Sequence, residues 1–285
     1  MAQMRNVHGA RLQTRIEDWF ARLDAIHIDR KPAEQMYCGS SWIPARRLCA
    51  AGKDSVWIVS AGNGLISPET NIAPYAATFT ANHPDSVVPQ RDSHFNAPDW
   101  WVACANRART AGRPGLLAEI ATANHKQPFI VALSREYYAA VENDLINARN
   151  TLADPDLLVL ISSGTPKCGE LKNNLLPCDS RMEHIVGKGR SALNIRILML
   201  IMDNYRSILR ASLLRNVFCS VQSPLESSTY PQRERATDDE VMNFIRASLR
   251  KQANLSHSRL LRIFRTTGRA CEQGRFKDLF LQITE

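Results

Sequence analysis

Apolar residues recur at helical spacing near the start of the chain and predict one amphipathic helix. The apolar positions follow the i, i+3, i+4 pattern over about four turns. They are Leu12, Ile16, Trp19, Phe20, Leu23 and Ile26. Pro32 then interrupts the pattern, because proline lacks the amide hydrogen that a helix needs. We expect this helix to cover a sheet and to carry no chemistry.

Three short apolar runs predict buried strands, at 56–59, 128–133 and 156–161. Each run is too short for a core helix and is rich in Val, Ile or Leu. Between the second and third runs lies a helical pattern that Ser134 is placed to cap. Its inner face is expected to hold Tyr137, Tyr138, Val141, Leu145 and Ile146. A strand, a helix and a strand in this order predict a βαβ unit with two parallel strands.

The later part of the chain is predicted to be helical. Residues 191–217 form a strongly apolar helical pattern with Ser191 as the expected N-cap, and the polar segment 220–236 indicates a linker. Beyond it, Thr237 and Ser256 are expected to cap two more helices, and 276–283 closes the chain as a third. The predicted architecture is an α/β domain over 1–219, with a mixed sheet and flanking helices. A small helical module of helix-turn-helix type follows over 220–285.

The excess positive charge of the chain lies in its C-terminal quarter. The 285 residues carry a formal net charge of +8. The segment 206–277 alone holds 14 Lys and Arg against 6 Asp and Glu, so the whole excess lies there. A localised, arginine-rich surface favours a polyanion such as DNA, and the alternative is a solvated basic face without a partner. We expect Arg259, Arg262, Arg265 and Arg269 to contact DNA, mainly at its phosphates.

Composition also indicates where the protein works. Its seven cysteines are scattered without C-x-x-C pairs, which is typical of free thiols in a reducing cytoplasm. The sequence has no apolar run long enough for a membrane span, and its first residues lack the apolar core of a signal peptide. We therefore expect a cytoplasmic protein without a membrane partner.

The most informative stretch is 37–79, where the first predicted strand ends in Ser60-Ala61-Gly62-Asn63-Gly64. Glycines at this point allow a ligand to approach backbone N–H groups closely. The third predicted strand ends in a similar way, in Ser162-Ser163-Gly164. In one open α/β sheet both turns would lie at the edge where ligands bind, and they would suit a polar planar ligand such as a nucleobase. The alternative is that both are ordinary turns after a strand.

The whole stretch is more specific than its parts. It reads Y-x-G-S-S, then S-A-x-x-G-L-I, then I-x-P-Y. The residues that carry this pattern are Tyr37, Gly39, Ser60, Gly64, Leu65, Ile72, Pro74 and Tyr75. In these residues the chain resembles the YaaA-like family of mixed α/β, DNA-associated proteins. The resemblance is strongest in the first third of the chain.

The resemblance implies an activity, partners and a set of site residues. It points to a member of a system that places 7-deazaguanines in DNA. The proposed activity of that member is hydration of the nitrile of 7-cyano-7-deazaguanine in DNA to the 7-amide. DNA containing a modified guanine, and other proteins of the system, would be its partners. The residues expected to bind the substrate, from the resemblance and from the two turns after strands, are Tyr37, Gly39, Ser40, Ser60, Gly62, Gly64, Tyr75, Ser162, Gly164, Asn194 and Arg196. Asn194 and Arg196 are included because the segment S-A-L-N-I-R occurs at the place where the family is expected to have it. An equal alternative is that both residues simply lie on the exposed side of a helix.

Hydrating a nitrile without a metal or other cofactor needs an activated nucleophile and a proton donor. A cysteine thiolate can add to the nitrile carbon and form a thioimidate, which water then opens. Cys38 stands in the central stretch, and Cys271 stands beside Glu272 with arginines nearby that would lower its pKa. Any single cysteine is more often a small buried apolar residue than a nucleophile.

Direct attack by water is the alternative, with Asp85 or Glu69 as the base. Asp85 lies in a long polar loop predicted at 80–98, which we expect to lie over the 62–64 turn. The same loop holds His83 and His94, whose spacing matches no standard metal site, so no metal is expected.

Three functions stay open on this basis. The first is the DNA-acting hydratase, and the second is a YaaA-like DNA-binding protein without catalysis. The third is an enzyme that acts on a free modified nucleobase or nucleotide. The basic C-terminal segment argues against a substrate that is only a free base.

Overall fold

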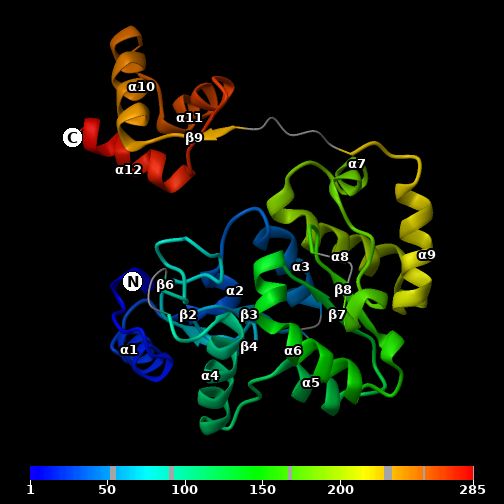
Figure 1. Cartoon of the computed structure of the whole chain (residues 1–285). Helices are drawn as coiled ribbons and strands as arrows, with labels where there is room; N and C mark the ends of the chain where they lie inside the picture. The colour runs from blue at the N-terminus through cyan, green and yellow to red at the C-terminus, as the bar shows by residue number, and fades with distance from the viewer. Residues whose placement is uncertain (52–55, 90–92, 166–168, 228–232, 253, 285) are drawn as a thin grey trace. The chain divides into compact units, whose positions relative to one another are not determined.

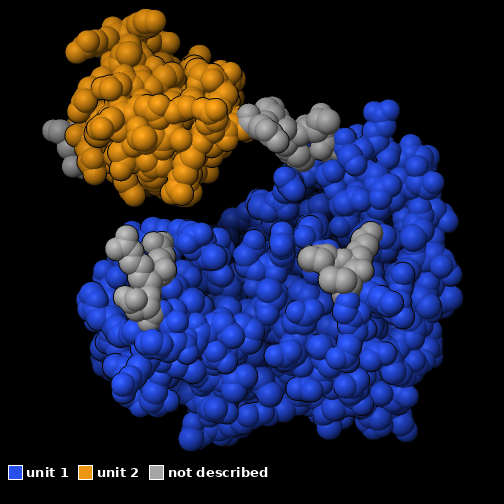
Figure 2. All heavy atoms as spheres, viewed as in Figure 1, with its two compact units in different colours: residues 1–227 blue, residues 228–285 orange. Residues whose placement is uncertain are grey.

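The computed structural model describes residues 1–51, 56–89, 93–165, 169–227, 233–252 and 254–284. The chain divides into two compact units, 1–227 and 228–285 (Figure 2). The boundary expected from the sequence, between 219 and 220, falls inside helix α9 (Ala211–Gln222). The expected linker at 220–236 also includes strand β9 (Glu234–Arg235) at its end, and its residues 228–232 lie outside the described residues.

The first helix, α1 (Leu12–Asp24), confirms the amphipathic pattern near the N-terminus. Ile16, Trp19, Phe20 and Leu23 are buried on one side of it. They belong to the largest hydrophobic core of unit 1, together with Trp100 from a later helix. Burying a large apolar side chain stabilises a fold by about 1.5–3 kcal/mol, so this face anchors the helix.

Six short strands in the first third of unit 1 form three pairs. Strand β1 (Ala2–Gln3) pairs in parallel with β6 (Tyr75–Ala76). Strand β2 (Lys31–Pro32) is antiparallel to β5 (Asn71–Ile72), and β3 (Ile58–Ser60) is antiparallel to β4 (Gly64–Ile66). Helices α2 (Ala33–Met36) and α3 (Trp42–Ala51) lie between β2 and β3 in the sequence. The strand predicted at 56–59 is therefore one arm of a hairpin.

The predicted βαβ unit is confirmed. Strand β7 (Phe129–Ala132) is parallel to β8 (Leu158–Ile161), and helix α6 (Arg135–Thr151) connects them (Figure 1). All four residues of β8 are buried. Leu158 and Leu160 pack in one core, and Val159 and Ile161 pack in a second core with helix α8 (Leu193–Asn204). A strand covered on both faces has no position for a polar residue, which explains its unbroken apolar sequence.

The predicted mixed α/β class is confirmed, but the strands do not join one mixed sheet. Within the described residues they form five separate sheets of two strands each. The chain turns back after β3, and β4 pairs with β3 in an antiparallel hairpin. The prediction that the glycine turns after β3 and β8 share one sheet edge is therefore wrong.

The apolar segment at 191–217 forms two helices, α8 and α9, instead of one. A 3₁₀ turn lies between them, and the Asp156 carboxylate accepts hydrogen bonds from Ser212 N at 2.8 Å and Ser212 Oγ at 2.6 Å, in the first turn of α9. Ser191, the expected N-cap, lies in a 3₁₀ turn that precedes α8. The other helices of unit 1 are α4 (Ala97–Thr110), α5 (Leu117–Ala123) and α7 (Glu183–Val186). The 3₁₀ turns among the described residues of unit 1 are Met4–Asn6, Pro155–Leu157, Glu170–Asn173, Ser180–Met182, Arg190–Ala192 and Arg206–Ile208.

The described residues of unit 2 form three helices, as predicted: α10 (Asp238–Lys251), α11 (His257–Thr266) and α12 (Gln273–Thr284). Thr237 is the N-cap of α10 and Ser256 that of α11. Their hydroxyl oxygens accept hydrogen bonds from the backbone N–H groups of Glu240 and Arg259, respectively. Strand β9 pairs in parallel with β10 (Arg269–Ala270), which the sequence did not predict. None of the helices in the described part of the chain is both long and apolar enough to cross a membrane.

Candidate site at a tyrosine–serine cluster

Three hydroxyl groups of the central stretch meet in one hydrogen-bonded group. The Tyr75 hydroxyl lies 2.7 Å from the Tyr37 hydroxyl and 2.7 Å from Ser60 Oγ. Tyr37 follows α2, Ser60 ends β3 and Tyr75 begins β6, so three elements position the group. All three residues belong to the predicted substrate-binding set, and the structure brings them together. We call Tyr37, Ser60 and Tyr75 the hydroxyl cluster.

Gly62 and Gly64 make room for this cluster. A Cβ atom on Gly62 would lie 2.4 Å from Cε2 of the Tyr75 ring, far inside van der Waals contact. Gly64 has a φ of +71°, and a Cβ atom there would lie 2.9 Å from Cβ of Cys104 on α4. The Trp19 indole also donates a 2.7 Å hydrogen bond to the Gly62 carbonyl oxygen. In this structure the two glycines thus serve close packing, not the exposed turn that we expected.

Burial keeps the phenols of the site protonated. It raises the pKa of Tyr75 well above its ordinary value, and the neighbouring Tyr37 raises it further. Burial is also the main cause that raises the pKa of Tyr37. Both side chains are half-buried, so part of each is accessible. At neutral pH these hydroxyls can therefore donate hydrogen bonds or protons to a ligand.

Tyr137 is a further residue of this site, and the sequence analysis assigned it only to the inner face of a helix. It stands in the first turn of α6, directly after the end of β7. Burial, and the proximity of Tyr75, raise the pKa of Tyr137 to about 12. Its ring packs edge-on against Phe79, with the ring centres 5.0 Å apart. The signal in the sequence was a pair of tyrosines just beyond the carboxyl end of a strand.

The segment after Tyr37 runs from the hydroxyl cluster to the start of α8. Cys38 is exposed, and Gly39 has a φ of +96°, a conformation that favours glycine. Ser40 Oγ lies 3.1 Å from Ser191 Oγ, in the 3₁₀ turn before α8. Three predicted site residues, Cys38, Gly39 and Ser40, therefore follow Tyr37 directly in the sequence, and Ser40 connects this segment with the second half of unit 1.

Asn194 and Arg196 use their side chains within the protein. Asn194 Nδ2 donates to the Leu133 carbonyl oxygen at 2.6 Å, and Asn194 Oδ1 accepts from Ser163 N at 3.0 Å. The amide thereby ties the carboxyl ends of β7 and β8 together. Arg196 Nη1 donates to the carbonyl oxygens of 187 and 188, at 3.1 and 2.6 Å. Both side chains hold loops in place, a role that neither the ligand contact nor the exposed helix side expected from the sequence describes.

Ser162 and Gly164 lie in the turn after β8. Ser162 Oγ is buried, 2.7 Å from Thr165 Oγ1, and Gly164 has a φ of +79°. In the described residues, neither of them forms a hydrogen bond with the hydroxyl cluster. The two turns were expected to lie at one edge of a single sheet, and they do not. The 3₁₀ turn before α8 contacts segment 38–40, and Asn194 of α8 binds the carboxyl ends of β7 and β8.

Asp85, a candidate acid or base, is held in an ion pair with Arg5. Its side chain accepts hydrogen bonds from Arg5 N at 3.2 Å and Arg5 Nε at 2.9 Å, and Arg5 Nη2 pairs with Oδ2. Burial alone would raise the pKa of Asp85, but these hydrogen bonds lower it below its ordinary value. A carboxylate held in this way is a weak base and not an acid at neutral pH. Its loop, predicted at 80–98, includes residues 90–92, which lie outside the described residues.

Cys271 and Glu272, the other catalytic candidates, belong to unit 2. Cys271 is buried, and burial raises the pKa of its thiol in spite of the nearby Arg275. The expectation that arginines lower this pKa is therefore wrong, because desolvation is the larger effect. The Glu272 carboxylate accepts hydrogen bonds from Gly274 N and Arg275 N, both at 2.9 Å, and so caps the start of α12.

The four arginines expected to contact DNA differ in their surroundings. Arg259 and Arg262 are exposed on α11, and within the described residues their side chains form no ion pair or hydrogen bond. Arg265 Nη2 donates to the Cys271 carbonyl oxygen at 3.0 Å. Arg269 pairs with Glu234 and with Glu240, two acidic residues of the same unit. Arg259 and Arg262 are therefore the two that are available to an external phosphate.

A pocket of about 410 Å³ opens next to the β3–β4 turn. Asn63 lines it, but the described residues of the 80–98 loop do not. The loop therefore does not close this pocket as we expected. Among the described residues, no three His, Cys, Asp or Glu side chains gather as they would around a metal ion.

Comparison of the chain with protein-family models, with curated proteins and with solved structures found no match.

Proposed function

We propose that the protein hydrates the nitrile of 7-cyano-7-deazaguanine in DNA and yields 7-amido-7-deazaguanine. This is the activity implied by its resemblance to the C component of the Dpd system, which places 7-deazaguanines in DNA. The observation that supports the proposal best is the hydroxyl cluster. Tyr37, Ser60 and Tyr75, which carry the resemblance, share hydrogen bonds of 2.7 Å, and the exposed Cys38 follows Tyr37 directly in the sequence.

The cluster suits the chemistry that nitrile hydration needs. In the proposed reaction, the Cys38 thiolate adds to the nitrile carbon, and a protonated phenol supplies the proton that the nitrogen takes up, giving a thioimidate. Water then adds to the same carbon and gives one proton to the nitrogen and the other to the phenolate left by the first step. The thiolate leaves and the amide remains, so the net change is the gain of one water. The raised pKa values of Tyr37 and Tyr75 keep both phenols protonated for this role.

The alternative route, direct attack by water with Asp85 as base, has less support. Asp85 is buried, its oxygens are occupied by Arg5, and its pKa is lowered. A base with a low pKa takes up a proton from water poorly at neutral pH. Cys271 is the weaker of the two cysteine candidates, since burial raises the pKa of its thiol.

Unit 2 would supply the contacts with DNA. Arg259 and Arg262 are exposed on α11, and arginine forms strong, bidentate hydrogen bonds with phosphate. A base within a duplex must leave the stack before an enzyme can reach it, which requires a firm hold on the backbone on either side. Contacts with phosphates would hold the strand without reading its sequence.

A DNA-binding protein without catalysis is the second candidate. The burial of Cys271 and the ion pair of Asp85 favour it, because both leave the site with fewer reactive groups than the sequence suggested. Under this function the hydroxyl cluster is a structural element, and DNA binding by unit 2 remains.

Mass spectrometry of nucleosides distinguishes the two functions. DNA that carries 7-cyano-7-deazaguanine is incubated with the protein, digested, and examined for a gain of one water. The wild-type protein and the Cys219→Ser control, which changes an exposed cysteine on α9, should both convert the base. The Cys38→Ser variant should lose conversion while it still binds DNA. Conversion that is equal in Cys38→Ser and Cys219→Ser would refute the role of Cys38, and binding without any conversion would support the second candidate.

A further inference from the structure

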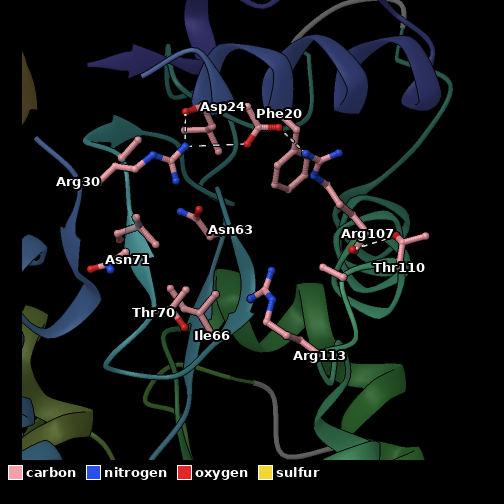
Figure 3. A pocket seen from close by; sticks show the side chains of 14 residues that line it. Phe20, Asp24, Arg30, Asn63, Ile66, Thr70, Asn71, Arg107, Thr110 and Arg113 are labelled. Carbon is pink, nitrogen blue, oxygen red and sulfur yellow. Dashed lines mark hydrogen bonds and ion pairs between the residues drawn. The ribbon is translucent and has the colours of Figure 1, made fainter. Parts of the chain in front are cut away.

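The pocket of about 410 Å³ in unit 1 has a strongly basic wall (Figure 3). It lies between the end of α1, the β3–β4 hairpin, β5 and the end of α4. Its volume falls in the range of about 300–1,000 Å³ that is typical of small-molecule sites. Three arginines and one aspartate line it, so its charged side chains have an excess of positive charge.

Two of the arginines are held in position by the protein. Arg107 forms an ion pair with Asp24, and its guanidinium lies 4.4 Å from the centre of the Phe20 ring. Arg30 donates to the carbonyl oxygens of Ile26, at 2.7 Å, and Leu23, at 2.8 Å. Arg30 also lies 3.9 Å from the same Asp24 carboxylate. One carboxylate thus places two guanidinium groups on the same side of the pocket and neutralises only part of their charge.

Arg113 approaches from the opposite wall. It follows α4, is exposed, and points toward the middle of the pocket (Figure 3). Within the described residues its side chain forms no hydrogen bond and no ion pair. An arginine with five N–H donors and no partner, aimed into a pocket with two other arginines, is arranged for an anion.

The rest of the wall would suit the organic part of a ligand. Asn63 and Asn71 bring amide groups that can both donate and accept hydrogen bonds. Phe20, Ile66 and Ile72 contribute apolar surface. A pocket of this size with amide groups, apolar surface and arginines is larger than an inorganic anion needs.

We propose that this pocket binds a phosphate monoester of nucleotide size, with the phosphate between Arg113 and the Arg30–Arg107 pair. Arginine is the side chain best suited to bidentate phosphate recognition. A monoester carries about two negative charges at neutral pH, which matches the excess charge of the wall. The phosphate could come from a free nucleotide or from the 5′ end of a DNA strand, and both present the same group. This inference does not rest on the nitrile-hydrating function.

Isothermal titration calorimetry of the full chain tests it, with guanosine 5′-monophosphate, guanosine, and a short oligonucleotide with and without a 5′-phosphate as probes. Guanosine 5′-monophosphate or the 5′-phosphorylated oligonucleotide should bind, and removal of the phosphate should weaken that binding. The Arg113→Gln variant should weaken it about tenfold, the effect of losing one hydrogen bond with a charged group. Arg11→Gln should change nothing, since Arg11 is exposed at the far end of α1.

The two sources of the phosphate give different results. Binding of the mononucleotide indicates a free nucleotide, whereas binding of the 5′-phosphorylated oligonucleotide alone indicates a DNA end. Equal affinity of the wild-type protein and Arg113→Gln for both phosphate probes would overturn the proposal, as would the absence of binding at millimolar concentrations. Because Arg113 is exposed, Arg113→Gln should keep the thermal unfolding midpoint of the wild type, which shows that a loss of binding is not a loss of folding.

Discussion

Replacing Gly62 by alanine should disturb the hydroxyl cluster more than any change of similar size nearby. The new Cβ would lie 2.4 Å from Cε2 and 2.6 Å from Cδ2 of the Tyr75 ring, and 3.1 Å from Cζ2 of Trp19. Carbon atoms in contact normally lie about 3.5–4.0 Å apart, so the ring must move by about 1 Å. Tyr75 cannot move freely, because its hydroxyl bonds to Tyr37 and Ser60.

The magnitude follows from two opposing effects. Overpacking in a core typically costs about 1–3 kcal/mol, and a ring held at its hydroxyl end places this case near the upper limit. The loss of backbone freedom in the unfolded chain offsets up to about 1 kcal/mol. We therefore expect Gly62→Ala to lower the free energy of unfolding by about 2 kcal/mol.

Gly112→Ala is the matched control. Gly112 has a φ of +68°, and a Cβ atom there would meet nothing within 4 Å. The control therefore measures the cost of a left-handed backbone alone, about 1 kcal/mol, without a steric conflict. Both variants are compared with the wild type by urea unfolding, followed by tryptophan fluorescence. A Gly62→Ala protein that is as stable as the wild type, or more stable than Gly112→Ala, would refute the close packing of Gly62 against Tyr75.

Two more predictions concern the ion pairs and the DNA contacts. Asp85→Asn should lower the free energy of unfolding at pH 7 by about 1–3 kcal/mol, because Arg5 loses a charged partner. The pKa of Asp85 is lower in the folded protein, so its charge stabilises the fold fully only above the unfolded pKa of about 3.9. The difference in the free energy of unfolding between Asp85→Asn and the wild type should therefore shrink as the pH falls below that value. A difference that stays constant from pH 7 to pH 3 would contradict this. The double variant Arg259→Ala/Arg262→Ala should weaken DNA binding, measured by fluorescence anisotropy, and reduce the slope of log affinity against log salt by about 2. Arg269→Ala, which breaks ion pairs with acidic residues of unit 2, should lower the unfolding midpoint of that unit and leave its DNA affinity nearly unchanged. Equal losses of DNA affinity in Arg269→Ala and in the double variant would argue against a special role of α11.

The sequence was most informative where local pattern and burial agree. The run at 156–161 reads as a buried strand because both faces of β8 are covered, and α6 between two such runs made the parallel pair predictable. Thr237 and Ser256 were recognisable as N-caps because the hydrogen bonds that a cap makes are local.

The parts that escaped prediction depend on contacts between distant residues. The sequence does not show that β3 pairs with β4, which leaves β7 and β8 as a separate sheet. The start of α9 is held by Asp156, which is remote in sequence. Asp85 suggested catalysis by its place in a polar loop, but its partner Arg5 lies near the N-terminus.

The candidate site shows the same division. Tyr37, Ser60 and Tyr75 could be named because the central stretch that contains them resembles that of a known family. Tyr137 could not, because it resembles an ordinary apolar position of a helix. The arginine pocket joins residues from the end of α1, from α4 and from two strand pairs, and no local pattern connects them.

The most direct test of the proposed function is the mass of one nucleoside. Purified protein is incubated with DNA that carries 7-cyano-7-deazaguanine, the DNA is digested, and the modified nucleoside is measured. The proposed function predicts a gain of one water with the wild-type protein and with Cys219→Ser, and loss of that gain with Cys38→Ser. An unchanged nucleoside in the presence of protein that still binds the DNA would contradict it.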